Sequence, residues 1–87
     1  MSIDAKATVS DGVVERMDGL SFGGRYCFPA GDGEAQSVEL AVWNDDVKAV
    51  RVKLHVGESF DFQGQTWRLD EIDDQGRHWY ATLTRVA

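Results

Sequence analysis

The sequence predicts an all-β fold, on the strength of three observations. Apolar and polar residues alternate along most of the chain, as in residues 37–43, where Val38, Leu40 and Val42 share one parity. Nine glycines punctuate the chain, and no segment keeps a helical apolar spacing for three turns. β-branched and aromatic residues dominate between the glycines. Short antiparallel strands joined by tight turns favour a small SH3-like meander barrel or roll, with a two-sheet sandwich as the alternative.

Length and composition indicate one domain. A chain of 87 residues buries only about 60% of its unfolded surface, so its small core must be packed efficiently. Residues 1–12 are predicted to be a flexible lead-in with at most a short strand, at residues 7–10, and residues 13–87 to form a single small β-barrel domain. The aromatic residues available for packing are Phe22, Tyr26, Phe28, Trp43, Phe60, Phe62, Trp67, Trp79 and Tyr80.

The first half of that domain contains one hairpin signal and one loop. The dipeptide Asp18-Gly19 suits a two-residue primed turn, because both of its positions need positive φ. Pro29 ends the strand that follows this turn. The predicted segments are strands at 13–17, 20–28 and 37–43, with a polar, glycine-rich loop at 30–35.

A further strand is predicted at residues 47–56. Its parity changes near Ala49, which indicates a bulge or a late start to pairing. We expect its apolar residues to face the core, namely Val50, Val52, Leu54 and Val56. The outward-facing residues are Arg51, Lys53 and His55.

The last third of the chain specifies its register most tightly. With Gln63-Gly64 as a turn, Phe60 lies opposite Trp67. With Gln75-Gly76 as the next turn, Ile72 lies opposite Trp79 and Asp73 opposite His78. A bulge at Asp70-Glu71 would then bring Leu69 opposite Ala81 and Trp67 opposite Leu83. The resulting apolar wall consists of Phe60, Trp67, Leu69, Ile72, Trp79, Ala81 and Leu83.

Charge and cysteine content exclude several classes of function. Fifteen Asp and Glu against nine Lys and Arg give a formal charge of −6, which disfavours nucleic acid as a partner. The single cysteine, Cys27, cannot form an internal disulfide and lacks neighbours at zinc-ligand spacing. The sequence contains no signal-peptide pattern and no apolar run of bilayer length, so we expect a cytoplasmic protein without a membrane partner.

The residues with reactive side chains form no catalytic pattern. The carboxylates of residues 70–74 lack the EF-hand spacing and are interpreted as a solvated hairpin end. His78 opposite Asp73 is interpreted as an exposed ion pair rather than a catalytic dyad. Cys27 has no base beside it, although Arg25 shares its parity. We therefore assign no catalytic residue, metal or cofactor, and favour a protein that is not an enzyme.

Trp43 fits a purely structural role least well. It shares its parity with Glu39 and Ala41, so we expect it outside the core, beside Arg51 and Lys53 across the hairpin. An exposed tryptophan next to arginine is typical of binding hot spots. In the alternative interpretation the indole folds over the end of the barrel or covers Ala41.

Several segments resemble a group of small uncharacterised proteins from Streptomyces and related actinobacteria. The similarity covers about residues 13–86 and involves turns and core positions. The segments are Gly19-Leu20-Ser21-Phe22-Gly23, Val56-Gly57-Glu58-Ser59-Phe60, the run from Gly64 to Ile72, and Leu83-Thr84-Arg85-Val86. The Val-Gly-Glu-Ser-Phe hairpin is also similar to hairpins of phage head-completion and other small-barrel proteins. The resemblance implies the fold, and it implies a possible link to specialised-metabolite pathways, but it provides no catalytic residues.

The leading functional hypothesis is a non-enzymatic binding or accessory module that contacts a protein or peptide. Its surface would be the outer face of strands 37–43 and 47–56 together with the 30–35 loop, and its contact residues Trp43, Arg51 and Lys53.

Two other functions remain open. One is a small-molecule-binding or cyclase-like barrel of specialised metabolism with an internal cavity. Its polar residues would be Tyr26, Cys27, His78 and Tyr80. The other is an inhibitor that binds a basic protein through its acidic surface.

Overall fold

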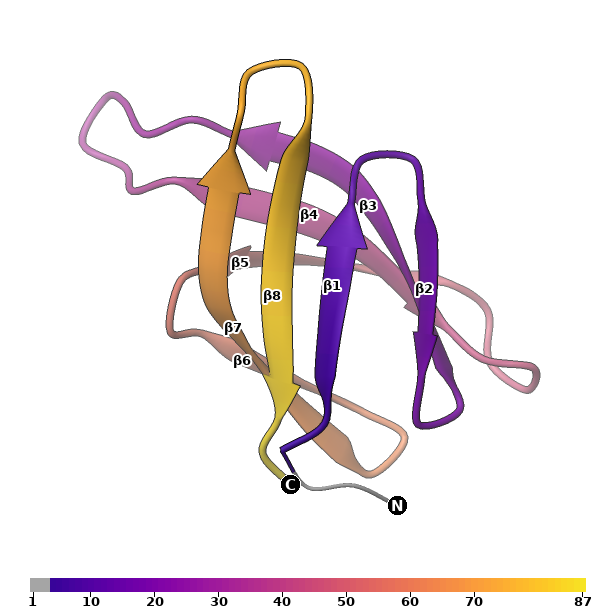
Figure 1. Cartoon of the computed structure of the whole chain (residues 1–87). Helices are drawn as coiled ribbons and strands as arrows, with labels where there is room; N and C mark the ends of the chain where they lie inside the picture. Colours follow the sequence, from indigo (N-terminus) through magenta and orange to yellow (C-terminus); the bar gives the residue numbers. More distant parts are fainter. Residues whose placement is uncertain (1–3) are drawn as a thin grey trace.

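The protein is a sandwich of two four-stranded antiparallel sheets. The computed structural model describes residues 4–87, so residues 1–3 of the expected lead-in lie outside the described part. The first sheet has the strand order β1-β8-β7-β6 and the second β2-β3-β4-β5 (Figure 1). The strands are β1 (Lys6–Ser10), β2 (Val14–Met17), β3 (Leu20–Phe28), β4 (Ser37–Trp43), β5 (Val50–His55), β6 (Ser59–Phe62), β7 (Gln65–Asp74) and β8 (Trp79–Arg85).

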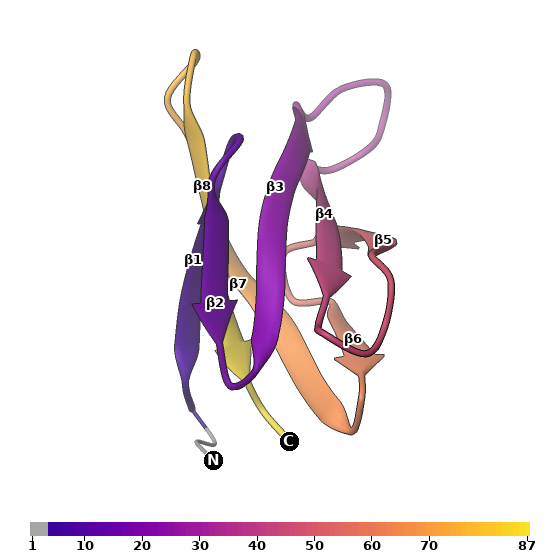
Figure 2. The same cartoon turned by 90° about the vertical axis from the view of Figure 1, so that its right-hand side faces the viewer.

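The all-β prediction is confirmed, and of the two architectures expected, the sandwich is the one found. The strands do not close into a barrel, because the turn between β5 and β6 leaves the second sheet. Gly57 N–H donates to Leu69 C=O over 2.8 Å, and Leu69 N–H donates to Glu58 C=O over 2.9 Å. These bonds attach the turn to β7, and β5 and β6 become edges of different sheets (Figure 2).

The chain also changes sheets after β1, which pairs with β8 rather than with β2. Ala7 and Val9 of β1 are fully buried, so this short strand is part of the core. At the crossing, Gly12 N–H donates to Gly24 C=O over 3.3 Å, and Ser10 forms a bridge with Val13. Both described ends of the chain meet nearby, since Asp4 N–H donates to Arg85 C=O over 2.9 Å.

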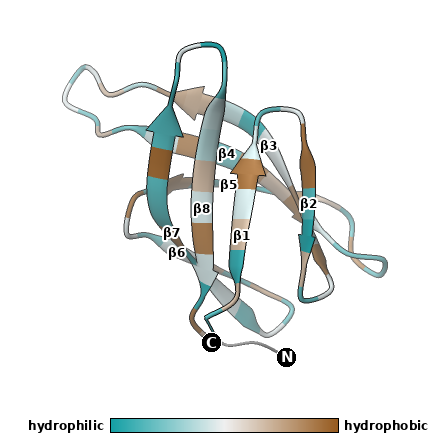
Figure 3. Ribbon diagram, viewed as in Figure 1, coloured by the Kyte–Doolittle hydropathy of each residue, from teal (hydrophilic) through white to brown (hydrophobic). Residues whose placement is uncertain are grey.

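The core lies between the sheets and is centred on aromatic contact. Phe22 of β3 and Trp67 of β7 are both fully buried, with ring centroids 5.0 Å apart in an edge-to-face arrangement. Hydrophobic and hydrophilic residues alternate along β7 (Figure 3), as a half-buried strand requires. The expected apolar wall is largely confirmed: Trp67, Leu69, Trp79, Ala81 and Leu83 are buried, and Phe60 and Ile72 pack against them.

The register predictions are confirmed for two turns. Asp18-Gly19 joins Met17 to Leu20 with φ of 52° and 80°, and Gln63-Gly64 joins Phe62 to Gln65. Phe60 accordingly lies opposite Trp67.

The third hairpin keeps the predicted bulge but not the predicted register. The shift lies between Leu69 and Glu71, as expected. Leu69, however, lies opposite Leu83 rather than Ala81, and Asp73 opposite Tyr80 rather than His78. The reason is the position of the turn. Asp74 pairs with Trp79 and the Gln75 N–H donates to the His78 C=O over 2.8 Å, so Gly76 and Arg77, rather than Gln75 and Gly76, are the central turn residues.

The prediction that the apolar residues of 47–56 face the core is only partly correct. Leu54 is buried, but Val50 is 42% exposed and Val56 54% exposed. The strand itself spans Val50–His55 at the edge of the second sheet. Val50 and Val56 therefore remain in contact with solvent.

One mostly buried ion pair connects the two sheets. Arg85 of β8 donates to Asp18 Oδ2 over 3.0 Å, and the two side chains are 9% and 12% exposed. Gln65 Nε2 donates to the Asp18 carbonyl over 2.8 Å. The β2–β3 turn is thereby fixed against strands of the first sheet.

Replacing Gly24 by Ala should destabilise the fold by more than about 2 kcal/mol. A Cβ at this position would lie 2.3 Å from the Ser10 carbonyl oxygen and 2.9 Å from the Trp79 ring. Gly31→Ala is the control, because nothing lies within 4 Å of a Cβ there. Chemical denaturation of both variants measures the effect, and equal midpoints would contradict the close approach of β1 and β3.

Asp18→Asn should lower the free energy of unfolding by about 2–3 kcal/mol, because Arg85 keeps its charge in a mostly buried position. Asn retains the turn geometry that Asp18 adopts at positive φ. The matched control is Asp45→Asn, since Asp45 is 95% exposed and lies 3.8 Å from Arg16. Its change should stay within about 0.5 kcal/mol. Urea titrations that gave similar losses for both variants would refute a structural role for the Asp18–Arg85 pair.

Candidate binding surface

The three residues expected to form a binding surface lie on one face of the second sheet. Ala41 is opposite Arg51 and Glu39 is opposite Lys53 in the β4–β5 ladder. Trp43 follows Ala41 by two residues, so all of these side chains share the face that points away from the first sheet. We call this the outer face of the second sheet.

Aromatic side chains of β3 extend the same face. Tyr26 lies opposite Glu39, and Phe28 lies opposite Ser37. They are 53% and 38% exposed, which leaves much of each ring in solvent. The Arg25 guanidinium lies 5.7 Å from the Tyr26 ring centroid, and the Lys53 ammonium lies 4.9 Å from that of Phe28. Both distances suit cation–π contacts.

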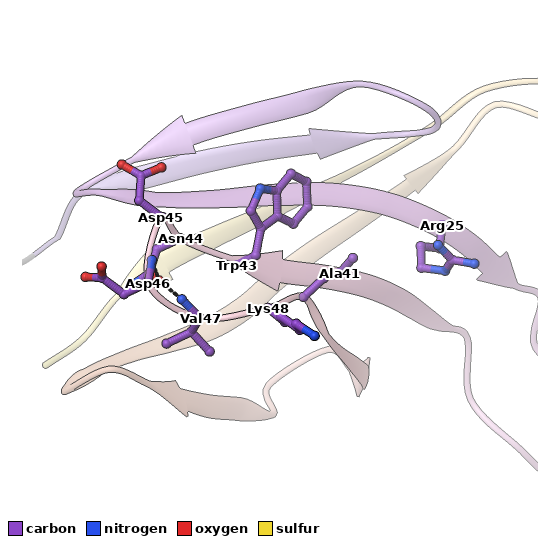
Figure 4. Close-up of a pocket in the computed structure, with 9 residues that line it drawn as sticks. Arg25, Ala41, Trp43, Asn44, Asp45, Asp46, Val47 and Lys48 are labelled. Carbon is purple, nitrogen blue, oxygen red and sulfur yellow. Dashed lines mark hydrogen bonds between the residues drawn. The ribbon is translucent and has the colours of Figure 1, made fainter.

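Trp43 forms one side of an open groove at the end of β4, with a volume of about 460 Å³. Figure 4 shows the indole standing out from the sheet between the Asn44-Asp45-Asp46 turn and Arg25. The turn is fixed by Asn44 Oδ1, which accepts hydrogen bonds from the backbone N–H groups of Asp46 and Val47 over 2.9 and 2.7 Å. The groove is therefore held open by local structure.

The position of the indole depends on Gly23. A Cβ built on Gly23 would lie 3.2 Å from one carbon of the Trp43 six-membered ring. The ring thus rests on the backbone of β3, and Trp43 is half-buried rather than fully exposed. This combines the two expected roles, because the indole covers part of the sheet and lines the groove.

Positive charge is concentrated on the outer face of the second sheet. Arg25 Nε lies 3.3 Å from Glu39 Oε2, and Arg16 lies 3.8 Å from Asp45. Within residues 4–87, Arg51 and Lys53 form no ion pair. These two exposed cations remain available to a ligand.

The outer face of the first sheet has the opposite character. The register brings Asp61, Glu71 and Asp73 to this side, together with threonines of β1 and β8. Asp70 accepts a hydrogen bond from the Thr84 hydroxyl, which lowers the pKa of its carboxyl group. Arg68 and Lys6, at 2.7 and 3.9 Å, lower it further. Asp70 is thus held ionised within a structural network.

The residues of the alternative pocket are dispersed. Tyr26 lies on the outer face of the second sheet and Tyr80 on that of the first. His78 is exposed in the β7–β8 turn. Cys27 faces inward at the end of the sandwich, and Arg25 pairs with Glu39 on the opposite face. These four side chains therefore line no common cavity.

The Cys27 thiol has neighbours that suppress its ionisation. Partial burial raises its pKa, and the Asp74 carboxylate raises it further, while a hydrogen bond from Gln36 acts in the opposite direction. The Asp74 oxygen lies 4.0 Å from Sγ and the Gln36 amide nitrogen 3.7 Å. This environment is the reverse of the electropositive one that activates a nucleophilic cysteine.

No metal-binding cluster occurs among residues 4–87, judged by groups of three or more His, Cys, Asp or Glu side chains. His55 instead lies 2.9 Å from Glu58, whose Oε1 also accepts the His55 backbone N–H. These hydrogen bonds lower the pKa of Glu58. In the same described range, no helix has the length and apolar composition needed to cross a bilayer.

One part of the surface, the position of Arg25, was not expected from the sequence. Arg25 reaches the outer face because the register of β3 shifts between Gly24 and Tyr26, and Arg25 had been placed with Cys27 by simple alternation. Two adjacent glycines, Gly23 and Gly24, were the available signal for such a bulge. The 30–35 loop, by contrast, lies at the β3–β4 connection, at the other end of β4 from Trp43.

The fold and this surface define a small β-sandwich domain with an aromatic, cationic outer face. The chain belongs to the family of unknown function DUF6406, whose model matches residues 4–87. Neither the curated proteins nor the solved structures contain a match.

Cys27 should react slowly with thiol reagents. Because its pKa is raised, a smaller fraction is thiolate at pH 7 than in an unstructured peptide, and alkylation should be slower than that of the peptide. The alkylation rate of Cys27 should increase with pH over a higher pH range than that of a free cysteine, because its pKa is raised. Asp74→Asn removes one of the causes and should accelerate the reaction. Iodoacetamide kinetics at several pH values measure this, and a rate above that of glutathione would contradict it.

Proposed function

We propose that this protein is a non-enzymatic binding module that contacts a protein or peptide through the outer face of the second sheet. The observation that carries the proposal is the combination of exposed aromatic rings with the cations held over them. Tryptophan, tyrosine and arginine are the residue types that dominate binding energy at protein interfaces. Here Trp43, Tyr26 and Arg25 occupy one continuous face.

Charge supports the same surface. The chain is acidic overall, with a formal charge of −6, yet this face carries Arg16, Arg25, Arg51 and Lys53. A partner with acidic groups would therefore be attracted to this side of the molecule and repelled by the carboxylates of the other. Electrostatics would orient the encounter before close contact forms.

A small-molecule function is favoured by one observation, the groove beside Trp43. Its volume of about 460 Å³ lies in the range of known ligand pockets, about 300–1,000 Å³. Such a ligand would bind outside the sandwich, because Trp67 and Phe22 fill the space between the sheets. The link to actinobacterial specialised metabolism rests on the sequence resemblance alone.

The third function, inhibition of a basic protein, would use the outer face of the first sheet. Asp61, Glu71 and Asp73 lie there beside the exposed ring of Tyr80, but without the cluster of aromatic residues that the other face carries at Trp43, Tyr26 and Phe28. The two hypotheses use different faces, so they predict that different substitutions abolish binding.

Trp43→Ala should weaken binding of a partner isolated from the native host by about thirtyfold, the loss typical of an interface hot spot. Tyr80→Ala is the matched control, because Tyr80 is 41% exposed on the opposite face. Quantitative affinity purification with wild type and both variants measures the effect, and circular dichroism verifies that each is folded. Equal retention by wild type and Trp43→Ala, or a selective loss with Tyr80→Ala, would refute this surface.

A further inference from the structure

The second sheet ends in an unpaired edge at β5. The strand order places β5 last in its sheet, with β4 on one side only. Its residues Val50 and Arg51 are exposed, as is Lys53. An exposed edge strand presents backbone hydrogen-bonding groups to which a further strand can pair.

His55 determines which backbone groups of β5 face that edge. Its N–H donates to Glu58 Oε1 over 2.7 Å, and its C=O accepts from the Glu58 N–H over 3.0 Å. The N–H and C=O of His55 are therefore directed away from Ser37, which lies opposite His55 on β4. Hydrogen-bonded and non-hydrogen-bonded pairs alternate along an antiparallel ladder. It follows that Lys53 and Arg51 also direct their N–H and C=O groups to the open edge.

The side chains beside this edge specify the chemistry of an added strand. Arg51 and Lys53 point to the outer face and form no ion pair within residues 4–87. Val50, 42% exposed, and the half-buried Val52 point to the inner face. A strand lying along β5 would gain most if its outward residues were acidic and its inward residues apolar.

We propose that β5 binds an extended segment of a partner protein, in which acidic and apolar residues alternate, by adding it to the second sheet as a fifth strand. This inference rests on the proposed function and names its partner class and binding mode. The backbone groups of Arg51 and Lys53 form the new ladder, and their side chains select the acidic residues.

Charge argues against a second copy of the chain as the occupant. In a twofold β5–β5 pairing centred on Val52, Arg51 of one copy would face Lys53 of the other on both sides of the axis. Like charges directly opposite each other destabilise a strand pair. Acidic residues of a partner strand, placed at the same positions, are instead attracted to Arg51 and Lys53.

The test uses a synthetic peptide of about eight residues in which glutamate and valine alternate, and a control peptide with lysine in place of glutamate. Calorimetric titration of the intact protein should show saturable binding of the acidic peptide only. Backbone amide exchange should slow at Arg51 and Lys53 on binding. No saturable binding, equal binding of both peptides, or fast exchange at these two amides in the complex would overturn the proposal, as would self-association of the chain through β5.

Lys53→Pro tests the backbone contact, because it removes an edge-facing N–H that β4 does not use. We expect at least about tenfold weaker binding of the acidic peptide. Asp61→Pro, on the edge strand β6 of the other sheet, is the control and should leave affinity unchanged. If Lys53→Pro fails to fold, the double variant Arg51→Glu with Lys53→Glu replaces it, with the preference for the two peptides expected to reverse.

The two proposals can fail separately. A host partner that depends on Trp43 but binds Lys53→Pro like the wild type would overturn strand addition and leave the proposed function intact. Peptide binding that depends on Lys53 but not on Trp43 would support the edge and overturn the outer face as the principal contact.

Discussion

The contact between Phe22 and Trp67 is the constraint on which the sandwich depends. The two rings come from different sheets and are completely buried, 5.0 Å apart between centroids. The Trp67 indole N–H is satisfied within the fold by Gln65 Oε1 at 3.0 Å, and Gln65 in turn binds the Asp18 carbonyl. A buried polar group without such a partner would carry a large cost. Packing and hydrogen bonding therefore fix the same sheet-to-sheet geometry.

Because aromatic side chains occupy the interior, the proposed binding surface lies on the outside of the sandwich. The two outer faces differ in composition. That of the second sheet carries Tyr26, Phe28 and the cations Arg51 and Lys53, and that of the first carries carboxylates, threonines and Tyr80. Asp70 illustrates the second kind of surface, since its charge is held by Thr84, Arg68 and Lys6 within the sheet. Arg51 and Lys53 form no ion pair in the described chain, and this difference separates the proposed binding surface from the outer face of the first sheet.

Strand positions followed from the sequence wherever alternation and a two-residue turn agreed. Residues 20–28 and 37–43 became strands with the predicted bounds, and the Gln63-Gly64 turn fixed Phe60 opposite Trp67. Prediction failed where the exact position of a turn decided the register, as after Asp74, and where contacts distant in sequence decided the pairing. β1 joins β8 across most of the chain, which no local pattern of residues 6–10 reveals. For the same reason, the sequence did not determine whether the strands close into a barrel or form a two-sheet sandwich.

The sequence predicted which face of the sheet the candidate residues occupy, but not which strands and residues surround them. Alternation alone placed Trp43, Arg51 and Lys53 on one face, and their exposure at an edge follows from strand order, which is a tertiary property. The same two cations have two physical consequences at that edge. They discourage β5 from pairing with another copy of itself, which is a hazard of any unpaired strand. In the proposed strand addition they would also attract an acidic strand, so protection against self-association and selection of a partner would arise from the same side chains.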